Sequence, residues 1–254
     1  LFRSRYVGYT FASAWVLWGI IIIGNQFNIL KYGTPLCMLF FIAGGLTPTI
    51  CEIWLKKKYS TSEDYKSFIK NIINPRHHIV WYIIVIGLVF TFTFLPTLLG
   101  GATMKQPLYL AIALFPLTII GGGLEEIGWR GFLQPALQEK HSTIMSTLIV
   151  SIIWVVWHLP LWFISGLPQA SMNFLLFSIN GIALSFLLAA ILYGTKSIFI
   201  CIIFHALLNS FSMVFVPNER LLPACFMLLF SVTTFLIIEK KSMKGNDLKI
   251  TGMV

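Results

Sequence analysis

Eight apolar runs, each long enough to cross a membrane as a helix, constrain most strongly what this chain can fold into. A spanning helix needs about 17 to 25 mostly apolar residues. The predicted spans lie near residues 8–29, 35–55, 79–99, 107–124, 143–164, 172–193, 197–216 and 221–238. We therefore expect an all-α fold, a polytopic bundle of about eight transmembrane helices, with residues 1–254 forming one integral membrane domain.

The composition excludes an ordinary soluble domain. Hydrophobic residues make up 57% of the chain and charged residues only 11%, whereas soluble domains carry about 25% charged residues. The net charge of +9 raises the question of nucleic-acid binding. Because the basic residues lie in short loops between apolar runs, they follow the pattern of membrane orientation instead, and no nucleic-acid partner is expected.

The distribution of basic residues predicts the orientation in the membrane. With the N-terminus inside and eight alternating spans, only Lys31, Lys105 and Arg220 of the 18 basic residues fall outside. The fifteen inside are Arg3, Arg5, Lys56, Lys57, Lys58, Lys66, Lys70, Arg76, Arg130, Lys140, Lys196, Lys240, Lys241, Lys244 and Lys249. This bias predicts cytoplasmic N- and C-termini, in the plasma membrane if the source is bacterial.

One polar segment, Lys56 to His78, separates the second and third spans. Ser62, followed by acids at 63 and 64, is typical of a helix start with Ser62 as the cap. Phe68, Ile69, Ile72 and Ile73 then form an apolar face, which predicts a short amphipathic helix on the membrane surface that ends at Asn74-Pro75.

The four cysteines give no metal or disulfide signal. Cys37, Cys51, Cys201 and Cys225 all fall in apolar runs without a CxxC pair, so we interpret them as small core residues.

Glu125, Glu126 and Arg130 follow a glycine run at the end of the fourth predicted span. Arg130 lies four residues after Glu126, the favoured order for a helical ion pair, whereas Glu125 is rotated about 100° away. This spacing predicts that Glu126 is structurally occupied and that Glu125 remains available for chemistry. The alternative is that all three residues end a membrane helix at the water boundary.

Two histidines lie inside predicted spans. Trp154 precedes His158 by one turn, so its indole is expected to pack against the imidazole. His205 and Asn209 share one face of the seventh span at the same spacing. Such polar residues in membrane helices also serve as helix-to-helix contacts, which remains the structural alternative.

Together these residues contain the groups needed to hydrolyse an amide inside a membrane. A carboxylate and a histidine, Glu125 and His158, can jointly deprotonate a water. His205 and Asn209 can donate hydrogen bonds to the oxyanion that forms when water attacks a peptide carbonyl. Glu125, His158 and His205 could equally hold zinc, which takes three such ligands plus water, although no HExxH helix is present.

The patterns EExxxR, WxxxH and HxxxN, in this order, resemble the three motifs of the CPBP (Abi) family of intramembrane proteases, relatives of the type II CAAX prenyl endopeptidases. The motif-bearing core covers about residues 107–216. The resemblance implies that Glu125 and His158 activate water and that His205 and Asn209 form the oxyanion site. Glu126, Arg130 and Trp154 support them. It also implies a glutamate mechanism without a cofactor, with a zinc-dependent version as the alternative.

We therefore predict an endopeptidase that cleaves a peptide substrate near the inner membrane surface, in contact with membrane lipid. The alternative is a non-catalytic membrane protein that confers bacteriocin immunity by binding a peptide. A fifth span beginning at Thr143 places His158 about 22 Å along its length. We therefore expect the fourth helix to continue beyond the glycines, the fifth to begin below the membrane, and the site to lie in a water-filled cavity open to the inner side.

Overall fold

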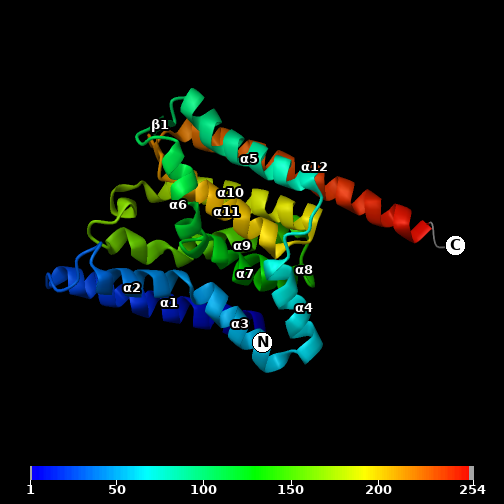
Figure 1. The fold of residues 1–254 in the computed structure, drawn as a ribbon, viewed down its shortest axis with the longest axis horizontal. Helices are drawn as coiled ribbons and strands as arrows, with labels where there is room; N and C mark the ends of the chain where they lie inside the picture. The colour runs from blue at the N-terminus through cyan, green and yellow to red at the C-terminus, as the bar shows by residue number, and fades with distance from the viewer. Residues whose placement is uncertain (1, 252–254) are drawn as a thin grey trace.

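A computed structural model describes residues 2–251 as a bundle of helices (Figure 1). For Phe2 and residues 243–251 the description is limited to the backbone, so the side chains of Lys244 and Lys249 lie outside it. The α-helices are α1 (Phe2–Gln26), α2 (Pro35–Gly45), α3 (Thr47–Tyr59), α4 (Ser62–Ile73), α5 (Ile79–Leu98), α6 (Tyr109–Ile120), α7 (Glu126–Gly128), α8 (Gln134–Gln138), α9 (Thr143–Trp157), α10 (Phe174–Thr195), α11 (Ile198–Ser212) and α12 (Leu221–Thr251). Short 3₁₀ or π segments are η1 (Gly123–Glu125), η2 (Trp129–Leu133), η3 (Leu159–Phe163) and η4 (Pro168–Ser171), and the strands β1 (Ala102–Met104) and β2 (Phe215–Pro217) pair antiparallel. The predicted all-α class is confirmed.

Among the described residues, six helical segments are long and apolar enough to cross a membrane. They are Arg3–Gln26, Ile79–Leu98, Tyr109–Gln138, Thr143–Phe163, Phe174–Thr195 and Leu221–Ser242. The pair α2 and α3, bent by 51°, makes a seventh if it is one span. The remaining predicted span corresponds to α11, which at 15 residues is shorter than a helix that crosses the whole hydrocarbon layer. With α2 and α3 counted as one span the total is seven, and the short helix α11 accounts for the difference from the predicted eight.

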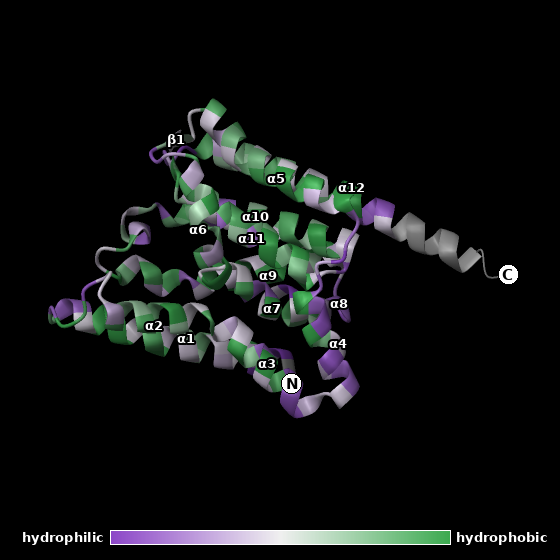
Figure 2. Ribbon diagram, in the orientation of Figure 1, coloured by the Kyte–Doolittle hydropathy of each residue, from purple (hydrophilic) through white to green (hydrophobic). Residues whose placement is uncertain are grey.

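The outer faces of these helices are apolar. Large side chains such as Val16, Ile83, Ile112 and Leu229 are more than 60% exposed, and hydrophobic residues run along most of the bundle (Figure 2). A water-soluble surface does not carry so much contiguous apolar area, so these faces contact lipid. Cys225 lies on this exposed surface, which corrects its interpretation as a core residue, whereas Cys37 and Cys201 are buried as predicted.

The two ends of the bundle differ in charge. One end holds the start of α1, the α3–α4 connection, α8 and the C-terminal end of α10, with Arg3, Lys56, Lys140 and Lys196 among its side chains; we call it the basic end. The opposite end carries β1 and β2, and we call it the hairpin end (Figure 1). The assignment of the basic end to the cytoplasm remains the prediction from the charge count.

Helix α4 begins one residue earlier than the sequence signal indicated. Thr61, not Ser62, is the cap, because the Thr61 Oγ1 accepts a hydrogen bond of 3.2 Å from the Asp64 N–H. Asn74 ends the helix as predicted. Its apolar face covers protein as well as membrane surface, since Phe68 packs with Ile127, Ile198 and Ile202, whereas Ile73 is 65% exposed.

The fourth span continues beyond the glycines, as expected. Helix α6 ends at Ile120, and Gly122, at φ +149°, breaks the helix in a conformation that only glycine adopts readily. Helical structure then resumes as η1, α7, η2 and α8, so that the whole segment Tyr109–Gln138 forms one span. Glu125 therefore lies about midway along a span and not at its end.

Candidate active site

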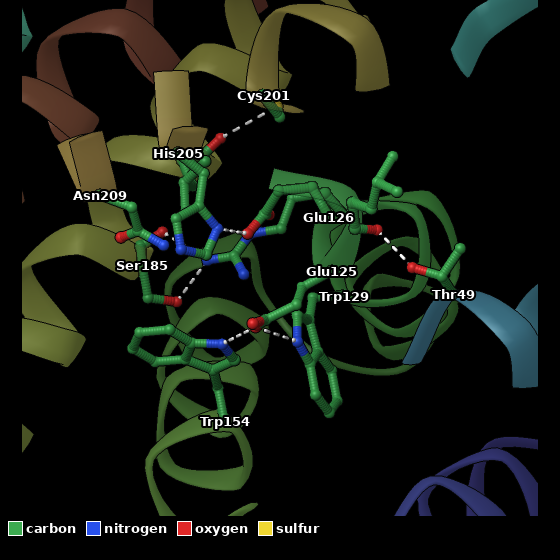
Figure 3. Close-up of polar contacts among 12 residues, drawn as sticks. Thr49, Glu125, Glu126, Trp129, Trp154, Ser185, Cys201, His205 and Asn209 are labelled. Atoms are coloured by element: carbon green, nitrogen blue, oxygen red, sulfur yellow. Dashed lines mark hydrogen bonds and ion pairs between the residues drawn. The ribbon is translucent and has the colours of Figure 1, made fainter. Parts of the chain in front are cut away.

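The Glu125 carboxylate lies in the centre of the bundle and is held by two indoles. Its Oε2 accepts a hydrogen bond of 2.8 Å from Trp154 Nε1 and a longer one of 3.4 Å from Trp129 Nε1 (Figure 3). The side chain is 7% exposed, and its Oε1 has no hydrogen-bond partner among the described residues. A buried carboxylate needs hydrogen bonds to be tolerated, and here one oxygen is bonded while the other remains open.

Glu126 points to different partners, as the helical rotation predicted. Its Oε2 lies 3.3 Å from Arg130 Nε, which confirms the ion pair. Its Oε1 lies 2.7 Å from Nδ1 of His205 on α11, a contact that the sequence did not reveal. Arg130 Nη2 also donates to Ser185 Oγ at 2.6 Å and to the Ser185 carbonyl oxygen at 3.1 Å. This buried network ties the motif to both α10 and α11.

His158 directly follows the last residue of α9 and is oriented by its own helix. Its Nδ1 lies 2.8 Å from the Trp154 carbonyl oxygen. Because a carbonyl only accepts, Nδ1 carries the hydrogen and the lone pair of the neutral ring is on Nε2. Three aromatic rings enclose the imidazole, with centroid distances of 4.4 Å to Trp154, 4.6 Å to Trp157 and 5.5 Å to Phe177. The predicted packing of Trp154 on His158 is confirmed.

The side chains of His205 and Asn209 both approach Gly122, a residue that has no side chain of its own. A Cβ at Gly122 would lie 2.1 Å from Asn209 Nδ2 and 3.3 Å from His205 Nε2. The absence of that atom lets both nitrogens face the same space beside the helix break. Gly122 is therefore a site residue that sequence reasoning missed; the glycine run before Glu125 was its only signal.

The helix break is supported by hydrogen bonds from neighbouring helices. Asn209 Nδ2 donates to the Gly121 carbonyl oxygen at 3.1 Å, and Thr49 Oγ1 donates to the Leu124 carbonyl oxygen at 2.5 Å. Irregular backbone at membrane depth persists where such partners satisfy its polar groups. One amide hydrogen of Asn209 thus makes a contact between helices, which is the structural alternative considered for this residue. The second amide hydrogen is not used by this bond.

Trp154 joins the three motifs. Its indole N–H bonds Glu125, its ring packs on His158, and its ring centroid lies 5.9 Å from that of His205. The sequence predicted the packing on His158 but not the bond to Glu125. The structure thus brings together all seven residues predicted for the site.

A cavity of about 310 Å³ adjoins the site. Trp154 and Asn209 line it, and it extends between α5, α10, α11 and α12 to Glu219 and Arg220. These last two residues lie at the hairpin end, so this cavity does not extend to the basic end, where we expected the opening. The difference arises because side-chain packing between helices decides where space remains.

A zinc site would require the side chains of Glu125, His158 and His205 to converge on one point. Among the described residues, no three histidine, cysteine, aspartate or glutamate side chains are grouped so that they could hold a metal ion. Nδ1 of His205 bonds Glu126 and Nδ1 of His158 bonds a carbonyl, which leaves both Nε2 atoms open and is also the arrangement of metal-bound histidines. The described side chains of Glu125, His158 and His205 are not grouped as a zinc site, and the mechanism without metal stays a prediction.

The fold and the site together define a class of protein, a helical membrane protein with a buried carboxylate and histidines around a break in one of its spans. Residues 107–211 match the family described as Type II CAAX prenyl endopeptidase Rce1-like. The chain is also 26% identical over 222 residues to CAAX prenyl protease 2 of Methanococcus maripaludis, an alignment that covers 79% of this chain and 80% of that protein. These findings confirm the family resemblance drawn from the motifs and support an intramembrane endopeptidase.

Proposed function

We propose that the chain hydrolyses a peptide bond within the membrane by a glutamate mechanism, with Glu125 and His158 activating water. The observation that carries the proposal is that the indole of Trp154 contacts both the Glu125 carboxylate and the His158 imidazole. Trp154 bonds one oxygen of Glu125 and packs on His158, which leaves Glu125 Oε1 and His158 Nε2 available. A water between them loses its proton to this pair as its oxygen adds to the peptide carbonyl carbon, and the proton then passes to the leaving amine.

His205 and Asn209 are proposed to stabilise the oxyanion. The free N–H of Asn209 and the Nε2 of His205 face the space beside Gly122. With Nδ1–H donating to the Glu126 carboxylate, Nε2 donates a hydrogen bond only when the imidazole is doubly protonated, and the same carboxylate compensates that positive charge. Donors arranged in this way before the reaction stabilise charge that develops in the transition state.

The cavity beside Trp154 and Asn209 is proposed to bind the substrate peptide. Its volume lies near the lower bound of the roughly 300–1,000 Å³ usual for ligand pockets. Phe92, Phe177 and Leu184 give it an apolar wall, and Asn180 adds an amide. This cavity extends toward the hairpin end, away from the end that the charge count predicts to be cytoplasmic. Cleavage near the inner membrane surface stays a prediction.

The proposed mechanism needs no metal, and this can be tested by removing metal. Activity of the purified protein is expected to survive thorough chelation, because the described ligand residues are not grouped around a common point. Elemental analysis of the same preparation is expected to show far less than one zinc per chain. Stoichiometric zinc, with activity lost on its removal and restored on its return, would establish the metal-dependent alternative.

The competing function is sequestration of a peptide, such as a bacteriocin, without cleavage. The two functions separate in a comparison of membrane peptides by mass spectrometry, between cells with wild-type protein and cells with Glu125→Ala. A protease is expected to leave cleaved fragments only with the wild-type protein. A binder leaves the same peptides in both cell lines, and immunity that persists in the variant would support it.

A further inference from the structure

A second cavity, of about 290 Å³, lies at the basic end between α4, α8, α10 and α11. It is separate from the substrate cavity and shares no lining residue with it. Nine of the described residues line it, none of these is acidic, and they include Arg130, Gln138 and Lys196. A cavity with two cations and no carboxylate in its wall favours a negatively charged occupant.

Two of the lining side chains have donors without partners. Arg130 is only 1% exposed; its Nε faces Glu126 and its Nη2 bonds Ser185, but its Nη1 has no partner among the described residues. Gln138 Nε2 is buried and likewise has no hydrogen-bond partner in the described chain. Buried donors nearly always have a partner in folded proteins. The unpaired Gln138 Nε2 therefore indicates that the cavity holds an acceptor, beside the Arg130 guanidinium in the same wall.

Lys196 supplies the second cation from the turn that ends α10. It adopts a left-handed conformation with φ +54°, and Asn71 fixes this turn by bonding the Lys196 carbonyl oxygen at 2.9 Å and the Ile198 N–H at 2.7 Å. The ammonium lies 4.8 Å from the centre of the Tyr193 ring, and no ion pair with a described carboxylate engages it. Lys196 is an exposed residue, and the partial burial of its ammonium lowers the pKa of Lys196.

We propose that this cavity binds a phosphate-bearing anion, as the headgroup of an anionic phospholipid or as free phosphate, through Arg130, Gln138 and Lys196. A guanidinium and an ammonium are the usual partners of phosphate oxygens. Basic pockets between membrane helices at the cytoplasmic surface accept anionic headgroups. Because Arg130 also pairs with Glu126, which bonds His205, an anion here contacts the network that positions the proposed oxyanion site. The binding itself does not depend on the proposed catalytic activity.

The test is a melting-temperature titration of the full-length protein in an uncharged detergent. Short-chain phosphatidylglycerol, short-chain phosphatidylcholine and inorganic phosphate are added in separate series, the last against chloride at equal ionic strength. Phosphatidylglycerol is expected to raise the melting temperature saturably and phosphatidylcholine is not. Lys196→Gln is expected to need about tenfold more phosphatidylglycerol, because it loses a charge-assisted hydrogen bond.

Lys140→Gln is the matched control, since Lys140 is exposed at the same end but does not line the cavity; it is expected to titrate like the wild type. A saturable effect of inorganic phosphate with the same dependence on Lys196 identifies the free anion as the ligand, and its absence identifies the lipid headgroup. The proposal is overturned if neither anion acts saturably, if phosphatidylcholine acts equally, or if Lys196→Gln matches the wild type. Since the measurement does not use turnover, an inactive protein still tests it.

Discussion

Glutamine in place of Glu125 is expected to lower kcat by roughly 10²–10⁴-fold, the usual contribution of a general base, while the protein remains folded. The amide has the shape of the carboxyl group, and its oxygen can still accept the Trp154 and Trp129 N–H bonds. It cannot accept the proton of water at neutral pH. Single-turnover rates on a cleaved peptide and the melting temperature, taken from one preparation, measure both effects.

The matched control is Glu139→Gln. It neutralises an exposed carboxylate that pairs with Arg3 and contacts none of the seven site residues through a hydrogen bond or ion pair. This variant is expected to keep the wild-type rate. If Glu125→Gln retains near-normal turnover while Glu139→Gln does as well, then another group accepts the proton and the role of Glu125 is wrong. A loss of rate accompanied by an equal loss of folded protein would also contradict the assignment.

The parts of the site that the sequence predicted are those set by local geometry. The Glu126–Arg130 pair and the Trp154–His158 packing both join residues four apart on one helix, where spacing alone brings side chains together. The spans were predicted for a similar reason, because length and apolar composition determine which segments can cross a membrane. The exception is α11, whose 15 helical residues are shorter than the apolar run that contains them.

The missed parts depend on contacts between distant segments. Glu126 and His205 are 79 positions apart, and Trp154 and Glu125 are 29 apart. Sequence pattern does not determine which of several polar groups in neighbouring helices will meet. Gly122 was missed for another reason: its positive φ and the lack of a Cβ matter only because Asn209 approaches it from α11.

The direction of the cavity could not be predicted from the sequence either. The charge count predicts which end of the bundle is cytoplasmic, and the basic residues do gather at one end. The cavity beside Trp154 and Asn209 nevertheless extends to the hairpin end, where Glu219 and Arg220 line it. Loop charge reports on how the chain was inserted, whereas a cavity forms wherever facing side chains fail to fill the space between helices.

Glu126→Gln is expected to lower the free energy of unfolding by about 3–5 kcal/mol, the usual result of removing one partner from a buried ion pair. Glu126 is fully buried, and glutamine leaves the Arg130 guanidinium without a counter-charge and gives His205 Nδ1 a neutral amide oxygen in place of a carboxylate. Unfolding in mixed micelles, followed by circular dichroism, measures the change. The rate is also expected to fall, because a neutral amide does not compensate the positive charge that His205 carries when it donates from Nε2.

The double variant Glu126→Gln/Arg130→Gln separates the ion pair from the rest of the network. Removing both charges leaves neither one unpaired, so the double variant is expected to be more stable than the sum of the two single losses predicts, with a coupling of roughly 0.5–3 kcal/mol. Its activity is expected to stay low, since His205 still lacks a carboxylate at Nδ1. Additive losses would show that Arg130 stabilises the fold through Ser185 alone. Recovery of activity along with stability would show that Glu126 acts on the site only by neutralising Arg130, and not by compensating the charge of His205.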